Sequence, residues 1–451
     1  MKEKHDILVA GGGIGGSLVS YFLASEGFDV IIVEQKHRDD TMKVCGDAIG
    51  KHHFDKIGIP HPSGRELDGI FRGVKVVAPN ERDEIIVGGE GYALNRPAFV
   101  KKLQTMALDA GAKLLDRHAV LKPIVDGSWL KGLEVVDLRA RRRREIEATV
   151  VIDATGVPAA VRSKLPNEWF ASEKVPPEDY DVCYREIVEM DEEIETGYAT
   201  IYLSTIIAPG GYWWWFPKNE SIVNVGLGLK GGKKSLNPER NYEIYLRSRI
   251  GKIRRVIHAG GGICPTRRTI SCMVWNGFVA IGDAACTSNP IHGGGMGPAM
   301  LSAKAAAKAI KKALSQDNPS MEGLWSYHND YMELYGAKQA GLDILRMYLQ
   351  LMSDEELNFV FEKGVITSVD VGEIGYRGDL GSTLISKVSS AIKLLSRPSL
   401  LVRLKKVKDY MDKARELYYS YPNSPDGFKA WKTQVDALFS EYKAWLGISS
   451  S

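Results

Sequence analysis

The sequence predicts an α/β fold with three parts: a Rossmann-like dinucleotide-binding domain, an antiparallel-sheet domain and a helical C-terminal region. Residues 6–34 have the order strand, glycine turn, helix and strand, which is the unit from which nucleotide-binding sheets are built. Several short runs within residues 182–229 alternate in polarity, as antiparallel strands do. From residue 314 onward the apolar spacing is helical.

The bulk properties exclude several classes of protein. A chain of 451 residues has room for two or three domains, and a net charge of +3 does not indicate a nucleic-acid partner. The five cysteines have no C-x-x-C spacing, so neither zinc nor an iron–sulfur cluster is expected. No apolar run reaches the roughly 18 residues of a transmembrane helix. The charged N-terminus leads directly into a strand, without a signal peptide, so we expect a cytoplasmic protein with reduced thiols.

The glycine turn is the element around which the rest of the chain is organised. It follows the short apolar run 6–10, which is typical of a buried parallel strand, and it precedes a helical stretch and a second strand at 30–33. Gly11, Gly13 and Gly16 form G-x-G-x-x-G. The motif alone is weak, but in register with both strands and the helix it predicts a dinucleotide site. The alternative is a glycine-rich turn without a ligand.

Each residue of this unit has its own physical role. Gly11 permits a tight turn, Gly13 lets the backbone approach a pyrophosphate, and Gly16 lets helix and strand pack closely. The helix N-terminus offers free N–H groups and a partial positive charge to the phosphates. Glu34, at the tip of the second strand, is placed to accept hydrogen bonds from an adenosine ribose.

The loop at residues 44–48 does not have the pattern of a helix or a strand. Gly46 indicates a close backbone approach to something flat, and we expect Cys45 to lie against a cofactor or substrate. The alternative is a loop with a buried cysteine.

The next segments predict a hairpin, a helix and three strands. Residues 74–87 alternate as a hairpin with its turn near Pro79. A helix follows from Pro97, and Arg96 just before it is placed for a phosphate contact or for a surface salt bridge. Strands are expected at 113–120, 133–138 and 150–156, the last beside the first strand of the chain. The four arginines at 141–144 have no interleaved aromatic residues and are interpreted as a solvated turn.

The densest aromatic stretch of the chain is residues 212–217. On a strand, Tyr212, Trp214 and Phe216 share one face, and Trp213 and Trp215 share the other. Five bulky aromatics exceed what one core needs, so one face is expected to line a long apolar pocket. The alternative is that all five belong to the core.

A third cofactor-like stretch begins at residue 277. A strand ends at Asp283, a glycine-rich loop follows, and an alanine-rich helix is expected at 298–313. The acid can bond a sugar-like chain, and the loop glycines can present N–H groups to a flat ring. His292 is interpreted as a loop residue with a structural bond, and the alternative role is a proton donor.

Further on, residues 387–415 carry nine Lys or Arg against two Asp, which fits either an anionic membrane surface or an ordinary helical layer.

The three separated elements 11–34, 150–156 and 278–297 together resemble the glutathione-reductase-type FAD fold of the aromatic-hydroxylase branch. Within that branch the chain resembles the archaeal geranylgeranyl reductases, also called digeranylgeranylglycerophospholipid reductases. The most specific parts are Cys45-Gly46-Asp47-Ala48, the Y-x-W-x-F-P pattern of residues 212–217, and the block from Gly282 to Gly297.

The resemblance implies an FAD-binding domain at 1–180 and 270–313 with a hairpin insertion near 70–90, an antiparallel-sheet substrate domain at 181–269, and a helical domain at 314–451. It implies a lipid tunnel at the strand of Tyr212, Trp214 and Phe216, with Gly293 nearby. The glycines of the turn and ten further positions would contact FAD: Gly15, Glu34, Cys45, Gly46, Ala48, Arg96, Val120, Asp283, Gly295 and Met296.

The implied reaction is saturation of the geranylgeranyl double bonds of an archaeal ether phospholipid by hydride from reduced FAD. Cys45 is a candidate member of the proton path. The rival of the same superfamily is a flavin monooxygenase or halogenase, because residues 211–217 also resemble G-W-x-W-x-I-P, although Tyr212 replaces the first Trp. A non-catalytic isoprenoid-binding flavoprotein is the alternative from another class. No second G-x-G-x-x-G with a following acid marks a nicotinamide site, so the external electron donor, a ferredoxin or a reduced nicotinamide, stays open.

Overall fold

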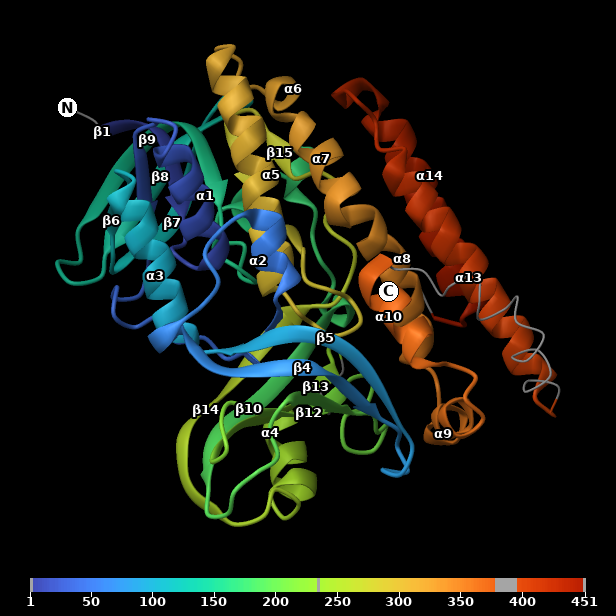
Figure 1. The fold of residues 1–451 in the computed structure, drawn as a ribbon. Helices are drawn as coiled ribbons and strands as arrows, with labels where there is room; N and C mark the ends of the chain where they lie inside the picture. Colours follow the sequence, from blue (N-terminus) through green and yellow to red (C-terminus); the bar gives the residue numbers. More distant parts are fainter. Residues whose placement is uncertain (1–2, 233–235, 378–395, 449–451) are drawn as a thin grey trace.

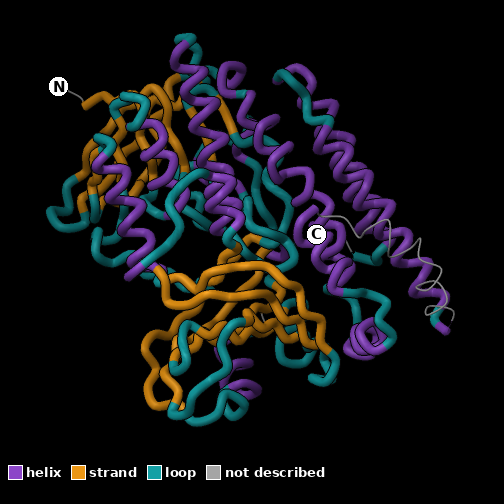
Figure 2. The backbone as a smooth tube through the Cα atoms, viewed as in Figure 1, coloured by secondary structure: helices purple, strands orange, loops and turns teal. Residues whose placement is uncertain are grey.

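The computed structural model describes residues 3–232, 236–377 and 396–448. Two eight-stranded sheets carry the architecture, and helices cover one flank of the molecule (Figure 1, Figure 2). The first sheet lies among the helices, and the second extends away from them. This arrangement confirms the predicted combination of a Rossmann-like sheet, an antiparallel sheet and a helical C-terminal region.

The first sheet is built on parallel strands whose carboxyl ends meet at one edge. In the register, Ala10 lies beside Val33 on one side and Asp153 on the other, and Asp153 lies beside Ala280. The prediction that strand 150–156 runs parallel beside the first strand is confirmed. The strands of this sheet are β1 (Glu3–Ala10), β2 (Val30–Val33), β6 (Lys113–Leu115), β7 (His118–Asp126), β8 (Trp129–Asp137), β9 (Arg143–Asp153), β15 (Val274–Trp275) and β16 (Phe278–Ala280). The arginine run begins in the turn before β9 and ends inside that strand.

The second sheet has the order β14-β10-β13-β12-β11-β4-β5-β3 and is antiparallel except for the β11–β4 pair. The predicted hairpin is confirmed as β4 and β5, and it joins this sheet rather than the first. The strands are β3 (Ala48–Gly50), β4 (Leu67–Val77), β5 (Glu84–Leu94), β10 (Tyr180–Met190), β11 (Tyr198–Tyr202), β12 (Tyr212–Pro217), β13 (Ile222–Lys230) and β14 (Ile253–Pro265). Strand β14 was not predicted, because consecutive glycines at 260–262 interrupt its β pattern.

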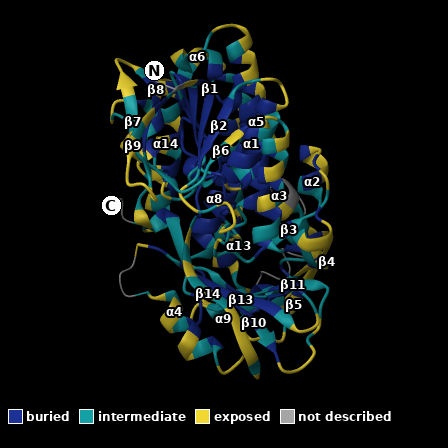
Figure 3. Cartoon of the chain, turned by 90° about the vertical axis from the view of Figure 1, so that its left-hand side faces the viewer, coloured by how far each residue is buried: buried dark blue, intermediate teal, exposed yellow. Residues whose placement is uncertain are grey.

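The helices begin and end near the predicted residues. Asn95 caps α3 by accepting a hydrogen bond from the Ala98 N–H at 3.2 Å. The buried residues concentrate in the first sheet and the helices packed on it, α1 and α5 (Figure 3). The principal helices are α1 (Ile14–Ala24), α2 (His52–Ile57), α3 (Arg96–Asp109), α5 (Met296–Ser315), α7 (Ser326–Tyr331), α8 (Ala337–Leu349), α9 (Asp354–Glu362), α10 (Ser368–Arg377), α13 (Pro398–Tyr419) and α14 (Phe428–Trp445), and two shorter ones are α4 (Pro238–Asn241) and α6 (Met321–Leu324).

The basic segment 387–415 lies partly outside the described residues. Its described part belongs to α13, which packs on α8 and buries Leu400, Leu404 and Val407. Those apolar side chains therefore belong to the protein core. Among the described residues there is no helix long and apolar enough to cross a membrane.

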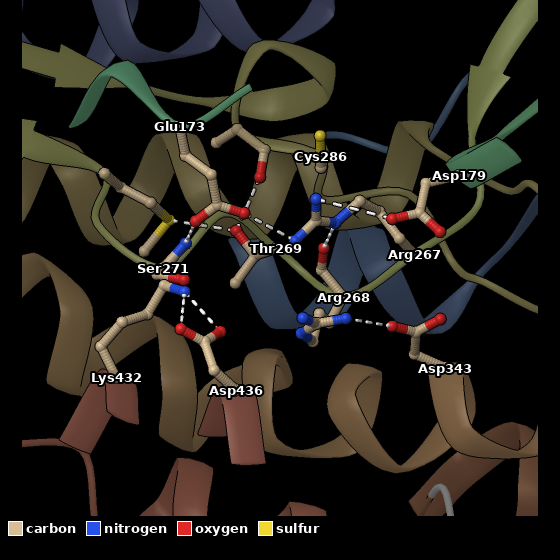
Figure 4. Close-up of polar contacts among 12 residues, drawn as sticks. Glu173, Asp179, Arg267, Arg268, Thr269, Ser271, Cys286, Asp343, Lys432 and Asp436 are labelled. Atoms are coloured by element: carbon tan, nitrogen blue, oxygen red, sulfur yellow. Dashed lines mark hydrogen bonds and ion pairs between the residues drawn. The ribbon is translucent and has the colours of Figure 1, made fainter. Parts of the chain in front are cut away.

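A buried network of charges connects segments that are far apart in the sequence (Figure 4). Arg267, in the segment after β14, donates to Glu173 at 2.7 Å and lies 3.6 Å from Asp179, just before β10. Arg346 of α8 bonds Asp343 at 2.7 Å and Asp179 at 3.3 Å. The network joins the start of the second sheet to the C-terminal helices.

Candidate active site

The glycine turn has the geometry that its sequence predicts. Gly11 has a positive φ of 101°, and a Cβ there would lie 2.4 Å from the Ala154 carbonyl oxygen. A Cβ on Gly16 would lie 1.9 Å from the Gly11 oxygen, whereas a Cβ on Gly13 would meet nothing within 4 Å. Gly11 and Gly16 are therefore required by the packing of α1, and Gly13 borders open space at the helix N-terminus. Gly15 faces the third cofactor-like segment, with Ile281 Cδ1 at 3.5 Å from an added Cβ.

Glu34 lies at the carboxyl end of β2, beside this turn. Its carboxylate accepts hydrogen bonds from the Gly12 N–H at 2.7 Å and the Lys36 N–H at 2.9 Å. Its own carbonyl accepts from the His118 N–H at 2.8 Å, which brings β7, and with it the partly buried Val120, to the same edge. Each carboxylate oxygen keeps a free lone pair for a further donor.

Asp283 lies just beyond the carboxyl end of β16 and holds the loop that precedes α5. Its carboxylate accepts from Ser288 Oγ at 2.7 Å and pairs with Lys43 at 3.2 Å. Burial alone would raise the pKa of Asp283, but Lys43 and Ser288, with Arg96 further off, hold it below its usual value. A Cβ on Gly295 would lie 2.6 Å from Ser288 Oγ and 3.1 Å from Asp283 Oδ1, so glycine is required there. Met296 begins α5 and is buried.

Arg96 is the strongest sign of an anionic ligand. The side chain is 7% exposed, and its Nε and Nη1 atoms have no hydrogen-bond partner in the described part of the chain. Its charge acts on both Asp283 and Arg185, which places it between the cofactor-like segments and the second sheet. A buried guanidinium with unpaired donors is costly, and a phosphate oxygen would satisfy it. The alternative of a surface salt bridge is wrong, because the side chain is buried and Arg96 has no ion pair with a described residue.

The loop 44–48 meets the aromatic strand. A Cβ on Gly46 would lie 2.9 Å from the Phe216 ring and 3.7 Å from Trp214 Nε1. The flat group that the backbone approaches at Gly46 is therefore the Phe216 ring of the protein itself. The Cys45 carbonyl accepts from Asn224 Nδ2 at 2.8 Å and Arg185 Nε at 3.2 Å. The loop is thereby fixed to β13 and β10.

Asp47 and Ala48 complete the attachment of this loop. Asp47 has a positive φ of 60°, is 1% exposed, and pairs with the buried Lys218 at 3.4 Å. Ala48 begins β3 and packs in one cluster with Trp214 and Phe216. The thiol of Cys45 accepts a weak hydrogen bond from the Asp47 N–H at 3.4 Å.

The two faces of the aromatic strand are separated as predicted. Trp214 and Phe216 pack in the cluster that includes Phe71, with Tyr212 beside it. Trp213 lies in a different core on the other face, with its ring stacked on Tyr202 at 3.7 Å, and Trp215 packs against that core. The face of Trp214 is therefore the one turned toward the loop 44–48.

Tyr212, Cys183 and Cys264 lie on this face of the second sheet and keep accessible surface. Burial is the main cause that raises the pKa of each. The Tyr212 hydroxyl donates to the His292 carbonyl at 2.6 Å, and Cys264 Sγ donates to the Gly293 carbonyl at 3.2 Å. The predicted Tyr212 and Gly293 therefore lie close together, where the glycine loop crosses this sheet face.

Gly228 leaves room on this sheet face. Gly228 lies between Tyr212 and Cys183 in the register, and an added Cβ would meet only Cys183 Sγ, at 3.3 Å. A hollow of about 380 Å³ is lined by the residues Lys36, Asp40, Met42, Lys43, Val44, His258, Gly261, Gly262 and Ile263.

A lysine and two histidines lie close together near the glycine loop: Lys338 of α8, His53 of α2 and His292. Burial and neighbouring charges, among them Lys338, lower the pKa of His53 to about 2, so His53 is neutral at pH 7. Burial and the charge of Lys56 lower the pKa of Lys338 to about 8. Burial and Lys338 lower that of His292 to about 4. His292 also accepts a structural bond from the Gly294 N–H at 3.1 Å through Nδ1, as predicted.

Sequence reasoning missed the polar residues that hold these segments together. Lys43 and Asp283 are 240 positions apart, and no local pattern relates them. Arg185 is fully buried and reaches the Cys45 carbonyl and His258 Nδ1, the latter at 2.8 Å. The only available signal was alternation along β10, which puts Asp181, Cys183 and Arg185 on one face.

Comparisons with known proteins agree with this geometry. A family model described as the geranylgeranyl reductase catalytic domain matches residues 179–264. The digeranylgeranylglycerophospholipid reductase of Sulfolobus acidocaldarius is 39% identical over 451 residues, which cover 99% of this chain and 100% of the relative. That of Methanothrix thermoacetophila is 30% identical over 84% of this chain and 95% of the relative.

Solved structures share the fold. A geranylgeranyl bacteriochlorophyll reductase-like protein from Thermoplasma acidophilum superposes with a TM-score of 0.76 at 22% identity, over 90% of this chain and 100% of its own. The myxobacterial chondrochloren halogenase CndH superposes with a TM-score of 0.62 at 17% identity, over 87% of this chain and 96% of its own. With the full-length relatives, these observations show that the chain belongs to the family of digeranylgeranylglycerophospholipid reductases.

Proposed function

We propose that the protein is an FAD-dependent reductase that saturates the geranylgeranyl double bonds of archaeal ether phospholipids. Membership of the reductase family supports this function. The observation that carries it is the contact between Gly46 and Phe216. It joins the loop implied to meet the flavin to the aromatic strand implied to hold an apolar chain, so that one site can serve both.

The residues present fit FAD. The open space at Gly13 and the α1 N-terminus suit a pyrophosphate, the unpaired donors of Arg96 suit a phosphate, and Glu34 can accept from a ribose hydroxyl. Gly15, Cys45, Gly46, Ala48, Val120, Asp283, Gly295 and Met296 complete the proposed cofactor site. When bound, reduced FAD supplies the hydride for the double bond.

The lipid would lie along the sheet face that carries Tyr212 and Trp214, below the glycine loop. Tyr212, Trp214 and Phe216 offer an apolar wall to the isoprenoid chain, and Gly293 borders it. Lys338, whose pKa of about 8 keeps it largely protonated at neutral pH, would hold the anionic headgroup, with His53 and His292 as neutral neighbours. Cys45 lies between the two parts, and its thiol is one candidate proton donor.

The rival functions have less support. Halogenases share the fold at lower identity, whereas the relatives that match along the whole chain are reductases. The electron donor, a ferredoxin or a reduced nicotinamide, stays a prediction. So do peripheral contact with the inner membrane surface through 387–415 and a cytoplasmic location.

Anaerobic photoreduction of the purified protein tests this function. The protein should bind FAD non-covalently, and the reduced form should add two hydrogens per double bond to a digeranylgeranylglycerol phospholipid, measured by mass spectrometry and by reoxidation of the flavin. Bound FAD without any mass increase of the lipid would contradict the reductase assignment and favour the non-catalytic alternative. Hydroxylation or halogenation of added substrates would favour the rival enzymes.

A further inference from the structure

A carboxyl group lies on the same sheet face as Cys183 and Arg185. Asp181 lies on β10 two residues before Cys183, on the face that carries Arg185. Its neighbours in the register are Lys230 on β13 and Cys264 on β14. The strand is regular from Tyr180 to Ile187, so the alternation of faces holds over this stretch.

Asp181 is surrounded by poor acids. Tyr212, Cys183 and Cys264 are acidic side chains near Asp181 on this face, and burial raises the pKa of each well above its ordinary value. The charge of Asp181 is a further cause of the shift in all three, so the four groups lie close to one another. None of the three neighbours gives up a proton readily at neutral pH.

The carboxyl group of Asp181 keeps its proton to a higher pH than an exposed aspartate. Burial raises its pKa to about 7, against the opposing effects of Arg346, Lys230 and a hydrogen bond from Thr266. Thr266 Oγ1 donates to Asp181 Oδ1 at 3.2 Å. Asp181 therefore binds and releases its proton near neutral pH, which is what general acid catalysis requires.

We propose that Asp181 is the proton donor to the isoprenoid double bond. The inference rests on the proposed function, because the hydride comes from the reduced cofactor. The step balances: the carboxyl O–H breaks and a C–H bond forms at one alkene carbon, while the hydride with its electron pair forms a C–H bond at the other. The carboxylate left behind recovers its proton from water. An isolated alkene is a poor hydride acceptor, so a protonated acid beside it is needed.

The rival donor is the thiol of Cys45, which lies beside the aromatic strand. A carboxylic acid leaves a resonance-stabilised anion, and Lys230 and Arg346 stabilise that anion after transfer. The Cys45 thiol instead accepts a hydrogen bond from the Asp47 N–H. We therefore assign the transfer to Asp181 and a cofactor contact to Cys45.

Asp181→Asn tests the assignment, because the amide keeps the shape but has no acidic proton. With pre-reduced holoenzyme and a digeranylgeranylglycerol phospholipid, single-turnover reduction should slow by about 10²-fold or more, with FAD content unchanged. The matched control is Asp191→Asn, an exposed residue just beyond the end of the same strand, which should turn over as the wild type does. If Asp181→Asn reduces the lipid as fast as the wild type, the role of Asp181 is wrong and the proposed function stands. If the wild type does not reduce the lipid either, the proposed function is wrong.

Two further measurements separate proton donation from a structural role. Infrared titration of the protein without substrate should show a protonated carboxyl that ionises near pH 7 and is absent in Asp181→Asn. Thr266→Val removes the hydrogen bond that stabilises the ionised carboxylate of Asp181. The pKa of Asp181 should therefore rise, and the loss of turnover at high pH should move to a higher pH. A carboxyl already ionised at pH 5, or a high-pH limb unmoved in Thr266→Val, would refute the proposal even if Asp181→Asn fails to fold.

Discussion

The buried network of Glu173 and Arg267 permits a quantitative stability prediction. Glu173 accepts from Arg267 Nη2 at 2.7 Å and from the Ser271 N–H at 2.8 Å, and the two side chains come from different segments (Figure 4). Burial alone would raise the pKa of Glu173. Arg267 and the hydrogen bonds from Ser271 outweigh that effect and lower it from 4.5 to about 2.

The size and sign of the effect follow from that pKa. A fall from 4.5 to about 2 corresponds to about 3 kcal/mol of folding free energy. Because the pKa is lower in the folded state, this stability is fully present above pH 4.5 and is lost as the pH falls toward 2. Glu173→Gln removes the charge at every pH and leaves Arg267 buried without its closest partner, so it should cost about 3 kcal/mol at pH 7.

Denaturant unfolding of the variant and the wild type at pH 7 and at pH 3 measures the difference. The deficit of Glu173→Gln should shrink toward pH 3, because Glu173 of the unfolded wild type takes up a proton below pH 4.5 and the folded wild type loses part of its advantage. Asp436→Asn is the control: its pair with Lys432 is exposed and lies within one helix, so its loss should cost at most about 0.5 kcal/mol. A deficit below about 1 kcal/mol at pH 7, or one equal at both pH values, would refute this account of the network.

Three predictions concern the active site. Glu34→Ala should weaken FAD binding by about 1–3 kcal/mol in a titration of apoprotein, because a ribose acceptor is lost; unchanged affinity would count against this role. Trp214→Phe should slow lipid reduction with a normal flavin spectrum, whereas Trp213→Phe, on the opposite face, should leave it near wild type; release of FAD by Trp214→Phe would favour the core interpretation of that strand. Cys45→Ser and Cys45→Ala should each keep single-turnover reduction within about tenfold of wild type, and a loss of about 10²-fold in both would return the proton role to the thiol.

The features that the sequence predicted are those set by short-range steric and periodic constraints. Gly11 and Gly16 fill positions where any Cβ would collide with backbone, and such constraints are visible in the sequence as glycines at fixed spacing. The two faces of the aromatic strand followed from the two-residue period of a strand alone. The resemblance of these segments to the reductase family added the expected cofactor and substrate.

The tertiary structure decided how these pieces meet. Strand β4 pairs with β11 across more than a hundred residues, which moves the hairpin into the second sheet, and the glycine-interrupted β14 becomes a strand because β10 pairs with it. The contacts of Lys43 with Asp283 and of Arg185 with Cys45, and the neighbours of Asp181, exist only once that pairing and its register are set. Sequence patterns report the faces of single elements, whereas a site made of polar groups from several elements depends on long-range register, which no local pattern encodes.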